Sequence, residues 1–149
     1  MKVLVKTLEH FDQKFELPQY QTKGAAGADI QASIPGAASI VIPAGKRELI
    51  PTGLAFEIPE GFEIQVRPRS GLSLKTNLLV VNAPGTIDSD YRGEVKIILG
   101  NFGSTDAIIS HGDRIAQLVF APVTQAIFQR GDHLSSTTRG AGGFGSTGV

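Results

Sequence analysis

Short apolar or alternating runs recur along this chain, and glycine, proline or aspartate interrupts each of them before it becomes long. Valine and isoleucine are enriched in these runs, as is typical of β-strands. No segment shows sustained helical periodicity, and turns are indicated at Pro35-Gly36 and Pro84-Gly85. The sequence therefore predicts an all-β protein, a jelly roll or distorted β-barrel, with at most one short helix.

The apolar runs also predict where the individual elements lie. One short helix is expected to start at Ser70, a favourable N-cap residue, and to continue through Lys75. Strands are expected over residues 3–8, 28–32, 39–42, 48–54, 62–67, 78–81, 95–99, 115–120 and 124–127. The core positions predicted from them are Leu8, Ile30, Val41, Ile64, Val66, Val80, Ile97, Leu99, Leu118 and Phe120.

Length and charge exclude several classes of protein. At 149 residues the chain is expected to form one domain, and its net charge of zero gives no basic excess for nucleic acid. It has no cysteine, so thiolate nucleophiles and cysteine–zinc sites are excluded. Without an apolar leader or a membrane-length apolar run, the expected protein is cytoplasmic and has neither a membrane nor a nucleic-acid partner.

The C-terminal segment is rich in glycine and carries few but distinctive other residues. Glycine lets a backbone lie close to a ligand, Arg139 suits phosphate oxygens, and the ring of Phe144 can stack on a base. The absence of a following helix argues against a P-loop or a dinucleotide-binding motif. We therefore expect residues 135–149 to be a flexible arm that closes over a nucleotide bound to a barrel of residues 1–134. Composition alone equally permits a disordered tail.

Two polar segments follow predicted strands. Arg67 and Arg69 precede the expected helix, whose first N–H groups favour an anion, so a phosphate site and solvated arginines are both open. Residues 82–93 form a turn-rich connection that holds several polar side chains. Asp88 and Asp90 face the same side of an extended backbone and could hold a metal or activate water. Aspartate is also an ordinary turn residue, but this concentration of polar groups favours function.

Polar residues elsewhere in the sequence carry weaker signals. Asp29 begins a strand after a small-residue turn, where a lone aspartate is more often structural than catalytic. Gln117 interrupts an apolar strand, as an edge residue or a ligand contact would. His10, His111 and His133 lack metal-ligand spacing, and there is no zinc-deaminase motif or nucleophile elbow.

In this order the segments resemble the homotrimeric dUTPases (deoxyuridine 5′-triphosphate nucleotidohydrolases), over residues 24–148. Ala28 departs from the family pattern, which more often has an aromatic residue there. The alternatives are a dCTP deaminase of the same fold family, which should lack this tail, and a non-catalytic nucleotide-binding protein, which would not need Asp88 and Tyr91. The motifs are Gly27-x-Asp29, Pro68-Arg69-Ser70-Gly71-Leu72, Ile87-Asp88-x-Asp90-Tyr91-x-Gly93, Asp113-Arg114-Ile115-Ala116-Gln117 and Gly143-Phe144-Gly145-Ser146-Thr147-Gly148.

The resemblance implies a jelly-roll homotrimer with three active sites at subunit interfaces, each drawing on all three chains. The family hydrolyses dUTP to dUMP and pyrophosphate with Mg²⁺, by attack of water on the α-phosphorus. That reaction lowers dUTP and supplies dUMP for thymidylate synthesis.

The resemblance also assigns roles by motif position. Asp88 would be the base that orients the water, Tyr91 would pack beneath the deoxyribose and exclude a 2′-hydroxyl, and Asp29 would act at the metal through water. Uracil would be read by Asn82, Gly85, Thr86 and Ile87; the phosphates would be held by Arg69, Ser70, Gly71 and Gln117; and Arg139, Phe144, Gly145, Ser146 and Thr147 would close over base and γ-phosphate.

Overall fold

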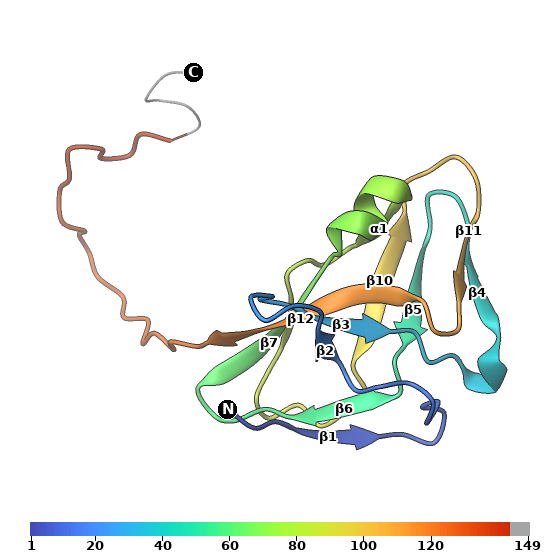
Figure 1. Cartoon of the computed structure of the whole chain (residues 1–149). Coiled ribbons are helices and arrows are strands. Elements are labelled where there is room, and N and C mark those ends of the chain that lie inside the picture. Colours follow the sequence, from blue (N-terminus) through green and yellow to red (C-terminus); the bar gives the residue numbers. More distant parts are fainter. Residues whose placement is uncertain (144–149) are drawn as a thin grey trace.

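The computed structural model describes residues 1–143 as short strands around one core, with a single α-helix (Figure 1). The all-β prediction is therefore confirmed. The strands are β1 Leu4–Thr7, β2 Gln19–Tyr20, β3 Ala28–Gln31, β4 Ser39–Ile42, β5 Arg47–Pro51, β6 Leu54–Glu57, β7 Phe62–Arg67, β8 Leu78–Val80, β9 Gly85–Ile87, β10 Lys96–Asn101, β11 Ala107–Ser110 and β12 Arg114–Pro122; α1 spans Ser70–Lys75, and a 3-10 turn spans Pro35–Ala37.

The largest sheet has the strand order β2-β3-β12-β7-β9, and β12 pairs antiparallel with a neighbour on each side. A three-stranded sheet of order β5-β10-β8 and two strand pairs, β1-β6 and β11-β4, complete the barrel. Most neighbouring strands are distant in sequence, so the fold depends on long-range pairing. No helix among residues 1–143 is long and apolar enough to cross a membrane.

Period-two alternation sends every second strand residue into the core. In β7, Ile64 and Val66 are buried while their neighbours are less so, and β10 buries Ile97 and Leu99. The predicted core positions are confirmed except for three. Val41 is 48% exposed because the pleat of β4 turns Ile42 inward instead, and Leu8 and Phe120 are only partly buried.

Two predicted strands were wrong in extent. Residues 48–54 form parts of two strands, β5 and β6, because the chain turns at Gly53, which has a φ of 69°. A Cβ there would lie 2.9 Å from Phe11 Cα, so glycine meets both constraints. Residues 124–127 are not a strand. Strands β2, β9 and β11, of two, three and four residues, were not predicted, since they are short or follow turn-rich segments.

The helix prediction was right in extent but wrong about its cap. Arg69 has extended angles (φ −88°, ψ 128°) and occupies the N-cap position without a side-chain cap, so Ser70 is already the first helical residue. The backbone N–H of Ser73 donates to the carbonyl of Arg69 at 3.0 Å. The short helix therefore begins directly after the arginine that the sequence marked as a phosphate ligand.

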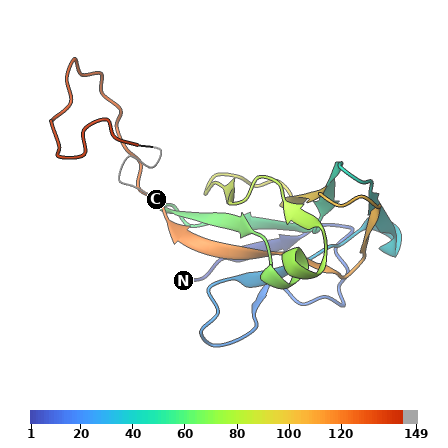
Figure 2. The same ribbon diagram turned by 90° about the horizontal axis from the view of Figure 1, so that it is seen from above.

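After Pro122 the chain leaves the barrel. Figures 1 and 2 both show the segment that follows β12 running away from the sheets. Ile127, Phe128 and Leu134 in this segment are almost fully exposed. Large apolar side chains in that setting have almost nothing to pack against among residues 1–143.

Ile64 provides a test of the core. Its side chain is fully buried in β7, between Phe120 of β12 and Ile87 of β9 in the strand register. Ile64→Ala is expected to lower the free energy of unfolding by about 2–5 kcal/mol, because it leaves a cavity. Ile108→Ala, at a position 62% exposed, should cost under about 0.5 kcal/mol. Denaturant unfolding of both variants at one protein concentration would measure this; equal losses would contradict the assigned core.

Candidate active site

One cluster of predicted site residues surrounds β9 at the edge of the large sheet. Ile87 pairs with Ile64, and Gly85 pairs with Val66, so β7 fixes the hairpin against the barrel. A Cβ on Gly85 would lie 2.9 Å from Nδ2 of Asn82, so glycine leaves room for the asparagine to fold back on the hairpin. The structure thus brings together the residues predicted to read a base.

An open pocket of about 480 Å³ lies beside this hairpin. Its volume falls within the range of small-molecule sites, and apolar and polar groups both contribute to its walls. The hairpin and the following loop give it Thr86, Ile87, Asp88 and Tyr91, and strands β5 and β10 give it Leu49, Lys96 and Ile98. The predicted base Asp88 and the predicted sugar platform Tyr91 therefore line one cavity.

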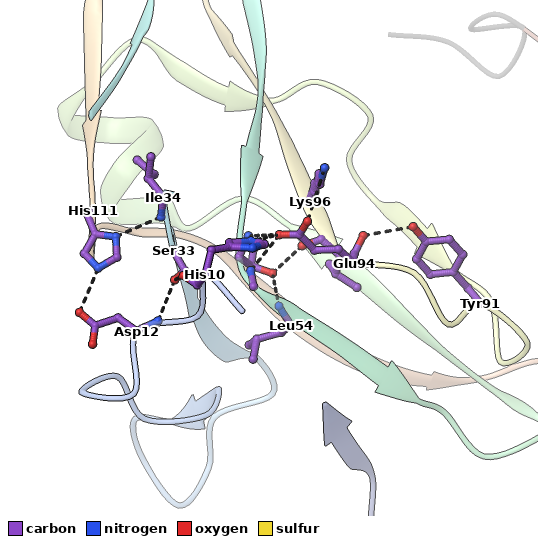
Figure 3. Close-up of polar contacts among 12 residues, drawn as sticks. His10, Asp12, Ser33, Ile34, Leu54, Tyr91, Glu94, Lys96 and His111 are labelled. Atoms are coloured by element: carbon purple, nitrogen blue, oxygen red, sulfur yellow. Dashed lines mark hydrogen bonds and ion pairs between the residues drawn. The ribbon is translucent and has the colours of Figure 1, made fainter. Parts of the chain in front are cut away.

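Tyr91 is held by its own loop although its side chain is partly exposed. Its backbone N–H donates to the Asp88 carbonyl at 3.2 Å, and its hydroxyl donates to the Glu94 carbonyl at 3.1 Å. A Cβ on Gly93 would lie 2.6 Å from Cζ of Tyr91, so only glycine lets the ring lie in this position. Figure 3 shows this hydrogen bond between Tyr91 and Glu94.

The carboxylate of Glu94 is anchored in the barrel. Its Oε1 accepts hydrogen bonds from the backbone N–H of Thr52 (3.1 Å) and Gly53 (2.9 Å), and His10 Nε2 lies 2.8 Å away. Lys96 Nζ is 3.4 Å from Oε2. Burial alone would raise the pKa of Glu94, but the Gly53 N–H, His10 and Lys96 together lower it.

A second cluster forms where β3, β12 and the end of β7 meet. Asp29 Oδ1 accepts from Arg69 Nε at 2.8 Å, and its Oδ2 accepts from Arg114 at 3.2 Å. Gln117 donates to the Pro68 carbonyl at 2.9 Å. A Cβ on Gly27 would collide with the side-chain amide of Gln117, which explains a glycine there. One carboxylate thus orients two guanidiniums, whose planar forks suit phosphate oxygens.

Ser70 and Gly71 extend this second cluster along α1. Both are exposed and directly follow Arg69, and the space around a Cβ on Gly71 is open. Their backbone N–H groups lie in the first turn of the helix, where intrahelical acceptors are missing. Asp29, Arg69, Ser70, Gly71 and Gln117 are therefore gathered at one end of the sheet.

Strand β7 separates the two clusters. Asp88 follows Ile87, which pairs with Ile64 near the start of β7, whereas Arg69 lies just beyond its end. From the level of Asp88 to Arg69 the backbone runs roughly 20 Å at about 3.3 Å per residue. Asp88 and Arg69 of one chain therefore cannot both contact a single phosphate group.

Residues 135–143, the described part of the arm, contribute to neither cluster in this chain. Arg139 Nε donates to the carbonyl of Gly142 at 2.9 Å, within the arm itself. Phe144, Gly145, Ser146 and Thr147, which were predicted to close over the ligand, lie outside the described residues.

Sequence reasoning missed Glu94, Lys96, His10 and Arg114. Arg114 stood inside a quoted motif without a role, and its contact with Asp29 depends on a register between β3 and β12 that spacing does not reveal. Glu94 lies eighty-four residues from His10 in sequence, and only the fold brings them together. The one local sequence signal for Glu94 was its position directly before Val95, which is buried.

Metal ligands are few in the described part of the chain. Within residues 1–143, no three histidine, aspartate or glutamate side chains gather as a metal site. Both oxygens of Asp29 already accept from arginines. Mg²⁺ keeps several waters and binds with few carboxylates plus substrate phosphates, so Asp29 fits a contact through water.

The fold and these clusters define a class: a jelly-roll protein with a nucleoside-sized pocket at a β-hairpin and an arginine-rich anion site at another sheet end. The dUTPase family model matches residues 13–148, and the chain belongs to that family. The deoxyuridine 5′-triphosphate nucleotidohydrolase of Rhizobium etli is 59% identical over 134 residues, covering 90% of this chain and 86% of the relative. That of Bdellovibrio bacteriovorus is 55% identical over 148 residues, covering 99% and 97%.

Solved structures confirm the jelly-roll prediction. The Staphylococcus bacteriophage 80alpha dUTPase with dUpNHpp superimposes with a TM-score of 0.86 at 28% identity, covering 99% of both chains. A mutant dUTPase of phage phi11 of S. aureus, which coordinates a structural Mg(II) ion, gives 0.78 at 24% identity, covering 91% of this chain and all of that one.

The anchored Glu94 predicts a pH dependence of stability. Because folding lowers its pKa, its contribution is complete above the unfolded-state value of about 4.3 and is lost as pH falls through the lower folded-state value. Glu94→Gln should therefore be less stable than the natural protein at neutral pH, and the difference should shrink below about pH 4. Unfolding curves across pH 3–7 would measure it; a difference that grows in acid would contradict the assignment.

Proposed function

We propose that this protein hydrolyses dUTP to dUMP and pyrophosphate. Family membership supports the reaction, and the observation that carries it to this chain is the pocket lined jointly by the hairpin, Asp88 and Tyr91. The activity would lower dUTP and supply dUMP for thymidylate synthesis, in the cytoplasm. The 80alpha dUTPase bound to dUpNHpp supports the substrate class.

The pocket residues divide the work between recognition and catalysis. Uracil would lie against the hairpin, where Asn82 and the backbone of Gly85, Thr86 and Ile87 offer donors and acceptors. The ring of Tyr91 would lie beneath the deoxyribose and leave no room for a 2′-hydroxyl. Asp88, at the rim, would accept a proton from the water that attacks the α-phosphorus.

The phosphate chain would be bound by a neighbouring chain. Asp88 and Arg69 of one chain are separated along β7, which favours an Arg69 cluster that serves a nucleotide held by another copy. There Arg69, Gln117 and the N–H groups of Ser70 and Gly71 would hold the phosphates and stabilise charge that develops in the transition state. This separation supports a homotrimer in which each site draws on several chains.

An exposed apolar face supports the same assembly. On the sheet β5-β10-β8, Leu49 and Leu79 are 51% and 39% exposed, and Val81 directly after β8 and Phe102 directly after β10 are 45% and 68% exposed. Leu49 also lines the pocket. A second copy covering this face would bury apolar area and at the same time border the nucleotide site.

Mg²⁺ is the proposed cofactor. When bound, it would neutralise charge on the triphosphate and help to align it for attack. Asp29 would hold it through water, while its two direct partners Arg69 and Arg114 remain beside the phosphates. Membership of the dUTPase family supports this choice.

The arm, residues 135–149, would close over the bound nucleotide. Arg139 would approach the phosphates, Phe144 would stack on the base, and Gly145, Ser146 and Thr147 would surround the γ-phosphate. Closure would exclude water other than the attacking molecule. The barrel of residues 1–134 would provide the rest of the site.

The proposed function is tested by a panel of dUTP, dTTP, UTP and dCTP with Mg²⁺. We expect nucleoside monophosphate and pyrophosphate from dUTP, far less from UTP because of Tyr91, and far less from dTTP because a 5-methyl group would meet the hairpin. Product analysis would distinguish the alternatives: ammonia release from dCTP would indicate a deaminase, and no turnover of any nucleotide would indicate a binding protein.

The role of Asp88 predicts a kinetic change without a structural one. Asp88→Asn is nearly isosteric but cannot take a proton from water, so kcat should fall about 10²–10⁴-fold with folding and dUTP binding largely intact. Steady-state kinetics, thermal melting and binding of a non-hydrolysable dUTP analogue would measure this. Turnover at the natural rate would exclude Asp88 as the base.

Removal of the arm predicts a protein that folds but hardly turns over. A chain ending at Leu134 keeps every strand, so melting and oligomeric size should be preserved. It loses Arg139 and the closing segment, so kcat should fall more than binding weakens. Oligomeric size, melting temperature and dUTP turnover of the truncated chain would test this prediction. Full activity of the truncated chain would show that the arm has no role in the reaction. Loss of folding would show instead that the arm is needed for the structure.

A further inference from the structure

We propose that Glu94 is a positioning residue that fixes Tyr91 and thereby determines how strongly the enzyme discriminates deoxyribose from ribose. The proposal rests on the proposed function, since it concerns the sugar pocket of that site. Glu94 borders the pocket, but the role assigned to it here acts through Tyr91.

The first step is the attachment of Glu94 to the barrel. Its side chain is only 11% exposed, and Oε1 accepts from the backbone N–H groups of Thr52 and Gly53. The ring nitrogen Nε2 of His10 lies 2.8 Å from the same oxygen (Figure 3). These groups belong to the β5–β6 turn and to the segment after β1. A carboxylate that accepts several charge-assisted or backbone hydrogen bonds in a buried place is held firmly.

The second step is the attachment of Tyr91 to Glu94. The Tyr91 hydroxyl donates to the Glu94 backbone carbonyl. Glu94 therefore binds the barrel through its side chain and the Tyr91 ring through its main chain. Gly93, between them, leaves the space that the ring needs. A shift of the Glu94 backbone would therefore shift the face of Tyr91 presented to the sugar.

Among the described residues, no side chain other than that of Glu94 attaches the loop of residues 88–94 to other elements through a hydrogen bond. These hydrogen bonds all end on the Glu94 carboxylate. Arg92 bonds only to the carbonyls of Ser89 and Tyr91, inside the loop. Beyond the loop, Val95 continues the attachment through backbone pairing with Leu54. Glu94 is thus the point at which the loop is tied down.

The experiment compares Glu94→Ala with a matched control, Asp12→Ala. Asp12 pairs with His111 at 3.2 Å at the far end of the same polar network, away from Tyr91 (Figure 3). For each variant, kcat/KM would be measured for dUTP and for UTP, together with the melting temperature. We expect Glu94→Ala to lower the dUTP:UTP ratio about tenfold, because small misplacements of a positioned group have effects of this order. Asp12→Ala should lower the melting temperature but leave the ratio unchanged.

Two further variants keep the proposal falsifiable. Glu94→Gln retains an Oε1 acceptor for the buried N–H groups, so it should keep the ratio. Tyr91→Phe removes the hydroxyl but not the ring and leaves the barrel untouched, so it should lower the ratio even if Glu94→Ala fails to fold.

The outcomes separate this proposal from the proposed function. If the natural protein does not hydrolyse dUTP, the proposed function fails. If it discriminates dUTP from UTP and both Glu94→Ala and Tyr91→Phe keep the full ratio, only the positioning role is overturned. An equal loss of ratio in Asp12→Ala would also overturn it, since general destabilisation would then suffice.

Discussion

The pairing of β12 on both of its edges is the constraint on which the rest of the structure depends. Gln117 lies opposite Asp29 of β3 on one side and opposite Arg67 of β7 on the other. That register sets Asp29 within reach of Arg69 and Arg114, and it orients Leu118 and Ile115 into the core. A one-residue shift in the pairing of β12 would exchange the two faces of the strand. It would therefore disrupt both the hydrophobic core and the cluster of Asp29, Arg69 and Arg114.

Because β7 is fixed to β12, it also fixes the distance between the two halves of the site. β9 pairs with residues 64–66 of β7, with Ile87 and the following Asp88 toward the start of the strand, and the Arg69 cluster begins beyond its end. A rigid strand of this length is the physical reason to expect active sites shared between chains. The apolar face beside the pocket and the exposed apolar residues Ile127, Phe128 and Leu134 of the segment after β12 agree with that expectation.

The sequence predicted most of the fold, because alternation of valine and isoleucine reports directly on a half-buried strand. It failed where alternation was ambiguous, as at Val41, and where two strands met at one glycine, as at Gly53. The site residues were recognised because their motifs follow one another in a characteristic order. Such motifs indicate the role of each residue but not the distances between the side chains. Glu94 and His10 could not be paired in this way, since they are eighty-four residues apart in sequence and their contact leaves no local pattern.

Whether the sites are shared between chains is tested most directly by mixing two inactive variants. Chains carrying Asp88→Asn and chains ending at Leu134 would be unfolded together and refolded as mixed oligomers. In a shared site, an intact Asp88 from one chain can meet an intact arm from another, so the mixture should hydrolyse dUTP faster than the sum of the two parent preparations. Activity no greater than that sum, in oligomers shown to contain both chains, would contradict the shared site.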